Sequence, residues 1–327
     1  MRALKFILIL LIIISVAYEF GPHPAEPKFD YNLPVITNNI NLDSLVQAGE
    51  KQHHLKPNNE AKIIWADSTH QQTEYAIVYL HGFSASQMEG APVHENIAKA
   101  FHCNLYLARL AEHGIDTTED LMNLTAENYW ESAKQAYAIG KQLGKKVILM
   151  STSTGGTLSL QLAAAYPEIA GLIMYSPNIE INNPAAPLLN NPWGLQIARL
   201  VKKGNYANIA FKNNEYPKYW NTHYRLESTV ALQNLIEATM TKETFDKIHQ
   251  PSLALYYYKD ELHQDNVVKV SAIKKMLSEI ATPDSLKQGI AIPNAESHVL
   301  GSPIVSKDSV TVEAVTKAFI ESKIIKH

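Results

Sequence analysis

The sequence predicts an α/β fold in which helices cover both faces of a mostly parallel central sheet and a mainly helical segment is inserted. Short, nearly continuous apolar runs alternate with helical patterns along the chain, as is typical of parallel strands buried on both faces. Residues 177–250 interrupt this alternation, because they are rich in proline and aromatic residues and show helical spacing only at 225–240. We therefore expect an insertion at about 177–250.

The remaining elements follow from apolar periodicity and from the small or polar residues that end each run. The expected strands are 62–66, 75–80, 103–108, a strand that begins at 147, 171–176, 252–258 and 288–293. The expected helices are 92–101, 125–143, 157–166, 225–240, 267–280 and 308–325, with a helical patch at 42–48.

Composition excludes several classes of function. The chain has 327 residues, a net charge of −3 and no long basic run, which argues against nucleic acid as a partner. Its 13 histidines show no metal-ligand spacing, so we expect no metal and no cofactor. The single cysteine, Cys103, cannot form an internal disulfide and is expected to be a small buried side chain.

The N-terminal segment suggests targeting. Arg2 and Lys5 precede an apolar run from Phe6 to Ala17, which is typical of a signal peptide or an N-terminal anchor at residues 1–17. We therefore expect a protein that is exported to the periplasm or the extracellular space, or one anchored to a membrane by this segment. Residues 18–60 are polar and proline-containing and are expected to form a linker and lead-in arm.

The most informative stretch lies between the strand that begins at Val147 and the helix expected at 157–166. It reads Ser151-Thr152-Ser153-Thr154-Gly155-Gly156, a run of small residues that requires a sharp turn. A strand, a tight turn and a helix form the context of a nucleophile elbow, which lifts one side chain above the sheet edge. Counting from the strand favours Ser153, with Ser151 as the alternative.

This stretch resembles the elbow of the α/β-hydrolase superfamily, Gly-x-Ser-x-Gly, with Ser151 in place of the first glycine. His81-Gly82-Phe83 after the second strand and Leu110-x-x-His113-Gly114 in a later loop also resemble that family. The resemblance implies the α/β-hydrolase fold for residues 61–327 and an oxyanion hole made by the backbone N–H groups of Phe83 and Thr154.

The resemblance also implies a general base and an acid. His298 lies in the loop after the last expected strand, where the family keeps its base. Asp260 directly follows the strand at 252–258, whereas Asp265 begins Asp-Asn-Val-Val, the family's usual signature for the acid. We expect Asp265 to be the acid and Asp260 to be the alternative. Ser153, Asp265 and His298 then follow the chain order of α/β-hydrolase triads.

Within that superfamily, these motifs look most like those of carboxylesterases and monoacylglycerol lipases. The resemblance implies a serine hydrolase that cleaves a small-molecule carboxylic ester with an apolar acyl group through an acyl-enzyme, under a cap at 177–250. The same triad could instead act on amide, thioester or carbon–carbon bonds, since fold analogy does not separate these reactions. A non-catalytic, exported binding protein on a hydrolase scaffold is the other alternative, and membrane association through the N-terminal segment is a further expectation.

Overall fold

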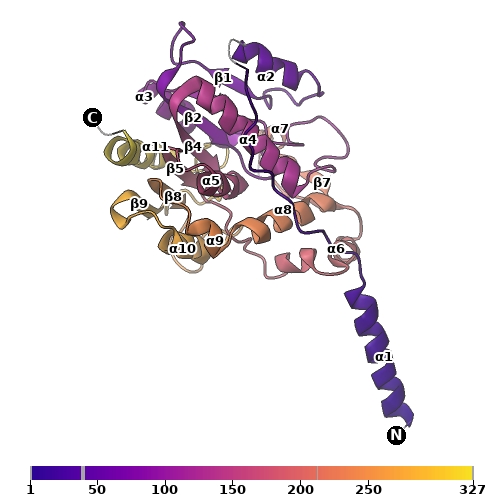
Figure 1. The fold of residues 1–327 in the computed structure, drawn as a ribbon. Coiled ribbons are helices and arrows are strands. Elements are labelled where there is room, and N and C mark those ends of the chain that lie inside the picture. The colour runs from indigo at the N-terminus through magenta and orange to yellow at the C-terminus, as the bar shows by residue number, and fades with distance from the viewer. Residues whose placement is uncertain (1, 38–40, 212, 326–327) are drawn as a thin grey trace.

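The computed structural model describes residues 2–37, 41–211 and 213–325. A seven-stranded sheet forms the centre of this part of the chain, in the order β1-β3-β2-β4-β5-β8-β9 (Figure 1). Only β1 is antiparallel, to β3, and the other neighbours run parallel. The strands are β1 (Lys62–Ile64), β2 (Thr73–Leu80), β3 (Asn104–Leu107), β4 (Gly144–Thr152), β5 (Gly171–Tyr175), β8 (Ser252–Tyr256) and β9 (Lys287–Ala291).

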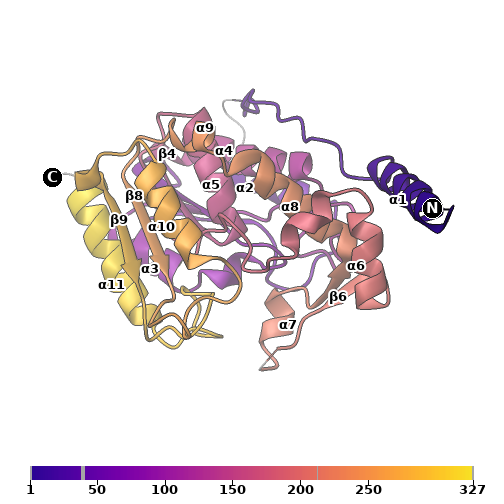
Figure 2. The ribbon, with the colours of Figure 1, turned by 90° about the horizontal axis from the view of Figure 1, so that it is seen from below.

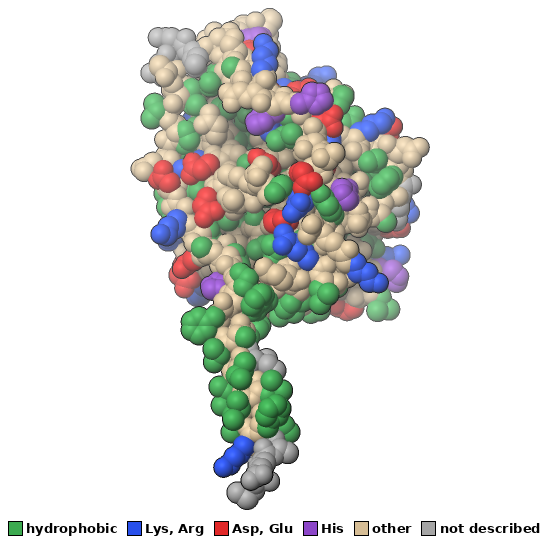
Figure 3. Space-filling view, turned by 90° about the vertical axis from the view of Figure 1, so that its right-hand side faces the viewer, with side chains coloured by type: hydrophobic (Ala, Val, Ile, Leu, Met, Phe, Trp, Pro, Cys, Tyr) green, Lys and Arg blue, Asp and Glu red, His purple; other side chains and the backbone are tan. Residues whose placement is uncertain are grey.

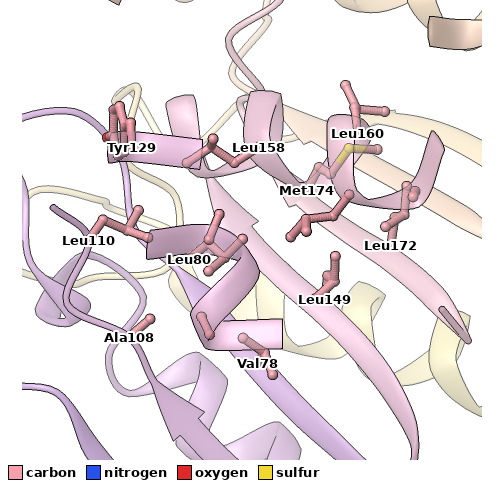
Figure 4. Packing of buried hydrophobic residues seen from close by; sticks show 14 of the residues in the cluster. Val78, Leu80, Ala108, Leu110, Tyr129, Leu149, Leu158, Leu160, Leu172 and Met174 are labelled. Atoms are coloured by element: carbon pink, nitrogen blue, oxygen red, sulfur yellow. The ribbon is translucent and has the colours of Figure 1, made fainter. Parts of the chain in front are cut away.

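Helices cover both faces of this sheet (Figures 1 and 2). Alternate residues of β2 point to opposite faces: Val78 and Leu80 join one apolar cluster, and Ile77 and Tyr79 join the other. Figure 4 shows part of the first cluster. The first face is covered by α4 (Ala126–Leu143), α5 (Thr154–Ala165) and α10 (Val270–Glu279), and the second by α3 (Val93–Ala100) and α11 (Ser309–Phe319). The predicted α/β architecture is confirmed, with element ends that differ by a few residues.

The segment between β5 and β8 forms the expected, mainly helical cap. It also contains a two-stranded antiparallel ribbon, β6 (Tyr206–Asn208) with β7 (His223–Arg225), which the sequence pattern did not predict because each strand is only three residues long. The helices of the cap are the 3-10 helix η2 (Ala186–Asn190), α6 (Gly194–Lys202), α7 (Tyr216–Tyr219), α8 (Leu226–Thr239) and α9 (Lys242–Phe245). Figure 2 shows α6, α7 and β6 on one side of the molecule, away from α11.

The N-terminal segment requires a correction. Arg2–Glu19 forms the helix α1, which extends away from the rest of the molecule with its apolar side chains on the surface (Figures 1 and 3). Its apolar run, Phe6 to Ala17, rises only about 18 Å, against the roughly 30 Å of a bilayer core. No helix in the described ranges is long and apolar enough to cross a membrane. The localisation predicted from a membrane anchor at residues 1–17 is therefore wrong.

The following segment runs across the outside of α4 before it reaches α2 (Leu42–Glu50), as Figure 1 shows. Two side chains of α4 hold its backbone. The indole of Trp130 donates to Asp30 O at 2.6 Å, and Lys134 Nζ donates to Asn32 O at 2.9 Å. This lead-in arm therefore lies on the helical layer, against α4.

Candidate active site

Ser153 occupies the turn between β4 and α5. Its backbone has φ 53° and ψ −119°, a strained conformation that side chains avoid and that projects the serine out of the sheet edge. The helix begins immediately afterwards and approaches β2 so closely that a Cβ at Gly155 would collide with the carbonyl of Leu80. The small residues around Ser153 are therefore required by the close approach of two backbones.

Ser151, the alternative nucleophile, lies within β4 and is completely buried. Its hydroxyl donates a long hydrogen bond of 3.4 Å to Ile173 O on the neighbouring strand. The position of the family's first glycine thus accepts a serine, because the added oxygen points to β5 and does not enter the turn. Ser151 has no access to a substrate in this arrangement.

His298 lies in the loop after β9, and its Nδ1 is 2.7 Å from Oδ2 of Asp265. Asp265 is 1% exposed, and its other oxygen, Oδ1, accepts from Val267 N at 2.8 Å and Val268 N at 3.1 Å. Both carboxylate oxygens are thus occupied, which orients the side chain and, through it, the imidazole. The structure brings Asp265 and His298 together.

Asp260, the alternative acid, is half exposed and binds a different histidine. Its Oδ1 lies 2.8 Å from Nδ1 of His263, three residues later. A bridge between Tyr258 and Gln264 closes this loop, so Asp260 lies at its tip while Asp265 N returns to donate to Tyr257 O at 3.0 Å. Asp265 is therefore nearer in space to the end of β8 than its place in the sequence suggests.

The pKa values of the pair reflect their proximity. Burial favours the neutral form of each, but the charge and hydrogen bond of Asp265 raise the pKa of His298 above its ordinary 6.5. Burial likewise opposes ionisation of Asp265, yet His298 and two backbone N–H groups hold the pKa of this carboxyl below its usual range. Asp265 is therefore an anion that favours a protonated His298.

The elbow and the histidine loop meet at the end of β5. Ser153 N donates to Tyr175 O at 2.9 Å, and the hydroxyl of the next residue, Ser176, donates to His298 O at 2.8 Å. Within the described residues, no hydrogen bond joins the Ser153 hydroxyl to the imidazole of His298. Such contacts in hydrolytic sites commonly tighten only when substrate binds.

The loop after β2 carries Phe83 beside this turn. In the part of the chain that the structure describes, the N–H groups of Phe83 and Thr154 donate to no protein group. The next residue of the loop, Ser84, donates its N–H to Nε2 of His113 at 3.0 Å, while Nδ1 of His113 lies 2.7 Å from Ala111 O. This places His113 behind the loop as its support.

His81 supports the same loop from its first residue. Its Nε2 accepts from Leu110 N at 3.1 Å, and its Nδ1 lies 2.9 Å from Gly82 O. Burial lowers the pKa of His81 to about 4 and that of His113 well below its ordinary value. Both imidazoles are therefore neutral, as acceptance of a backbone hydrogen bond at Nε2 requires.

The cap covers the site with apolar side chains. Trp220, which is 3% exposed, packs against Ala85 of the loop after β2 and against Val299, the neighbour of His298. The ring of Phe83 meets that of Tyr224 edge to face, with centroids 5.2 Å apart. A substrate at Ser153, which is itself only 6% exposed, would thus be surrounded by apolar groups.

Sequence reasoning missed one buried acid, Glu89, at the end of the 3-10 helix η1 (Gln87–Glu89). Its Oε2 accepts the N–H of Gly82 at 2.6 Å. Burial raises its pKa to about 7, although Gly82, His298 and Trp220 each favour the ionised form. No signal in the sequence marks this residue, since a glutamate next to a glycine is ordinarily a solvated side chain.

Among the residues that the structure describes, no group of three or more His, Cys, Asp or Glu side chains is placed to hold a metal ion. Cys103 is buried beside β3, and burial raises the pKa of its thiol to about 12. The thiol is therefore inert.

Comparisons with known proteins identify the family to which this chain belongs. The family described as serine aminopeptidase, S33, matches residues 125–294, just over half of the chain. A thermostable monoacylglycerol lipase from Bacillus sp. (strain H-257) is 28% identical over 188 residues, which are 57% of this chain and 70% of the lipase.

Solved structures show the same fold. A structure reported with the metagenome-derived lipolytic enzymes LipS and LipT has a TM-score of 0.65 and 18% identity, and the match covers 82% of this chain and 99% of that one. A monoacylglycerol lipase from Paleococcus ferrophilus has a TM-score of 0.58 and 14% identity, with 80% and 97% of the two chains covered. The chain therefore belongs to the serine aminopeptidase S33 family of α/β-hydrolases, and it is similar to monoacylglycerol lipases.

Proposed function

We propose that the protein hydrolyses carboxylic esters with an apolar acyl group, through an acyl-enzyme on Ser153. The observation that carries the proposal is the 2.7 Å contact between His298 Nδ1 and Asp265 Oδ2, next to a serine in a strained turn. A serine hydroxyl is a weak nucleophile at neutral pH and needs a base whose ring is held in one tautomer. Asp265 supplies that restraint.

In the first half-reaction, Oγ of Ser153 attacks the ester carbonyl and its proton passes to Nε2 of His298. The oxygen of the tetrahedral intermediate carries the negative charge and accepts from the N–H groups of Phe83 and Thr154. Each such donor is typically worth about 3 kcal/mol in the transition state. The carbon–oxygen bond to the alcohol then breaks, and the alcohol leaves with the proton from His298.

In the second half-reaction, water attacks the acyl carbon and gives its proton to His298. The bond to Ser153 breaks, the serine recovers this proton, and the carboxylic acid leaves. Asp265 remains ionised throughout, in keeping with the lowered pKa of its carboxyl. It stabilises the imidazolium in both halves of the cycle.

An apolar acyl group is supported by the side chains around Ser153. The apolar side chains there are Phe83 from the loop after β2, Tyr224 and Trp220 from the cap, and Val299 next to His298. The similarity to a bacterial monoacylglycerol lipase makes monoacylglycerols the first natural esters to test. The family description, serine aminopeptidase, supports a second candidate, hydrolysis of an aminoacyl amide on the same serine.

The test combines turnover with active-site labelling. p-Nitrophenyl esters of two to twelve carbons, monoacylglycerols and aminoacyl p-nitroanilides would be compared, and a fluorophosphonate probe would report the nucleophile. We expect ester turnover, and in Ser153→Ala a loss of labelling with a fall in kcat/KM of about 10⁴-fold or more. The matched variant Ser151→Ala should label as the wild type does and keep kcat/KM within about threefold, because it removes only a weak hydrogen bond.

Each outcome has a definite meaning. Turnover of anilides without esters would replace the ester proposal by the amide one. Labelling that survives Ser153→Ala and disappears in Ser151→Ala would show that the nucleophile is misassigned. A folded wild type that neither labels nor turns over any substrate would point to a binding protein.

A further inference from the structure

We propose that Glu89 is a positioning residue for this reaction: its buried carboxylate anchors the loop that carries Phe83 and faces the imidazole of His298. The inference rests on the proposed ester hydrolysis and names a side chain that the triad and the oxyanion hole do not include. Three independent features support it, namely a hydrogen bond, a contact with the cap and a charge.

The hydrogen bond anchors the loop next to the oxyanion donor. Glu89 is 2% exposed, and its Oε2 lies 2.6 Å from the N–H of Gly82, the residue before Phe83. A Cβ added to Gly82 would be 2.9 Å from Ser153 Cβ and 3.0 Å from this same oxygen. Gly82 therefore fits between the nucleophile and the carboxylate, and a shift of Glu89 would move the backbone that presents the Phe83 N–H.

The second feature is the cap. The indole of Trp220 lies beside the carboxyl of Glu89 and lowers its pKa. The Trp220 ring also packs on Ala85 and Val299, the first in the oxyanion loop and the second beside His298. The carboxyl of Glu89 thus contacts both the cap, at Trp220, and the loop that carries Phe83. The Trp220 ring in turn packs against the loop that carries His298.

The third feature is charge. The titratable or polar side chains that face Glu89 come from every element packed around it: Tyr79 of β2, Tyr129 of α4, Tyr216 of α7, Trp220 of the cap and His298. Burial and Glu89 together raise the pKa values of the three tyrosines, so all three are neutral. His94 of the adjacent α3 is also neutral, since burial lowers its pKa to about 4.

His298 is therefore the group facing Glu89 that gains a positive charge during catalysis, and Glu89 adds to Asp265 in raising its pKa. A buried charge is costly, and a glutamine could accept the Gly82 N–H without that cost. Accepting the Gly82 N–H thus does not by itself call for a carboxylate. What the carboxylate adds, when it is ionised above its pKa of about 7, is a negative charge that stabilises the imidazolium in the transition state.

The experiment measures kcat/KM for a p-nitrophenyl ester between pH 5 and 9 in Glu89→Gln, Glu89→Asp and the wild type. With a pKa of about 7, Glu89 is partly ionised in the range where His298 titrates. Removing this charge should lower the pKa of His298, so the fall in activity at low pH should move to lower pH by roughly half a unit. The plateau should fall about tenfold, because the glutamine NH₂ faces the Trp220 N–H and leaves a buried donor unpaired. The control Glu180→Gln removes an exposed acid paired with Lys269 and should shift neither quantity.

Glu89→Asp keeps the charge but withdraws it from Gly82, so its plateau should fall while its low-pH midpoint stays near that of the wild type. Trp220→Phe keeps an apolar ring and loses the indole N–H. The double variant with Glu89→Gln should lose little more activity than the worse single variant, because both substitutions break the same contact. A Glu89→Gln midpoint equal to that of the wild type, or losses that multiply in the double variant, would overturn the proposal.

If Glu89→Gln fails to fold, the other two variants decide. Plateaus within twofold of the wild type in both Glu89→Asp and Trp220→Phe would then overturn the proposal, and falls of threefold or more in both would support it. Failure of the proposed function itself is a separate result, because it would appear as absent ester turnover in the wild type.

Discussion

Replacing Asp265 by asparagine tests the assignment of the acid with a nearly isosteric change. Oδ1 of Asp265 accepts from Val267 N and Val268 N, and Oδ2 faces Nδ1 of His298. The asparagine oxygen must therefore occupy the Oδ1 position, which places its NH₂ against the imidazole. Nδ1 then becomes an acceptor and the proton moves to Nε2, where it blocks proton transfer from Ser153.

The expected size follows from this change of tautomer. In Ser-His-Asp triads the exchange lowers kcat by about 10⁴-fold, or about 5 kcal/mol of transition-state stabilisation. Loss of a charge-assisted hydrogen bond should lower the free energy of unfolding by roughly 1–3 kcal/mol. The activity loss would then exceed what partial unfolding can explain, provided that the variant melts well above the assay temperature.

The matched control is Asp260→Asn. Asp260 is half exposed, and among the described residues its carboxylate bonds only to Leu262 and His263 of its own loop. We therefore expect kcat/KM within twofold of the wild type. Turnover of a p-nitrophenyl ester, the rate of fluorophosphonate labelling and a thermal melt would be measured for both variants. An Asp265→Asn enzyme within tenfold of the wild type, or a 10³-fold loss in Asp260→Asn, would refute the assignment.

Two further predictions concern pH and packing. Asp265 raises the pKa of His298, and only the neutral imidazole can accept the serine proton. We therefore expect kcat/KM to fall as the pH drops, with a midpoint above 6.5. A midpoint at 6.0 or below would contradict the pairing of the two residues. Gly155→Ala should destabilise the protein by about 3 kcal/mol, since the added methyl group collides with the backbone of β2. Gly204→Ala adds the same atoms into open space, so urea unfolding of the two variants should differ clearly, and equal midpoints would refute the packing argument.

Much of the fold could be predicted because it depends on local pattern. A strand covered on both faces must be apolar nearly throughout, and Tyr75–Leu80 is such a run. The sharp turn at Ser153 was visible because only small residues allow a helix to start so close to a neighbouring strand. The ribbon of β6 and β7 could not be predicted, because a strand of three residues shows too little alternation of apolar and polar residues to be distinguished from a loop.

The predicted N-terminal anchor fails for a related reason. The composition of residues 6–17 shows that they are apolar, but a helix that crosses a bilayer must also be long enough to span its hydrocarbon core. Twelve apolar residues in a helix span about 18 Å, which is too short. The sequence pattern correctly indicates an apolar segment, but the length of this segment does not support an anchor.

The strand-and-helix order, the likeness to α/β-hydrolases and a serine, aspartate, histidine order along the chain follow from the sequence, because each can be recognised from short stretches of neighbouring residues. Two features become apparent only in the folded protein: His298 contacts Asp265 and not Asp260, and Glu89 is buried. Both depend on contacts between segments that are separated along the chain. The loop closed by Tyr258 and Gln264 brings Asp265 back to the end of β8. The cap, which follows Glu89 by more than a hundred residues, buries its side chain. Burial and ionisation are set by these distant contacts, which no local pattern records.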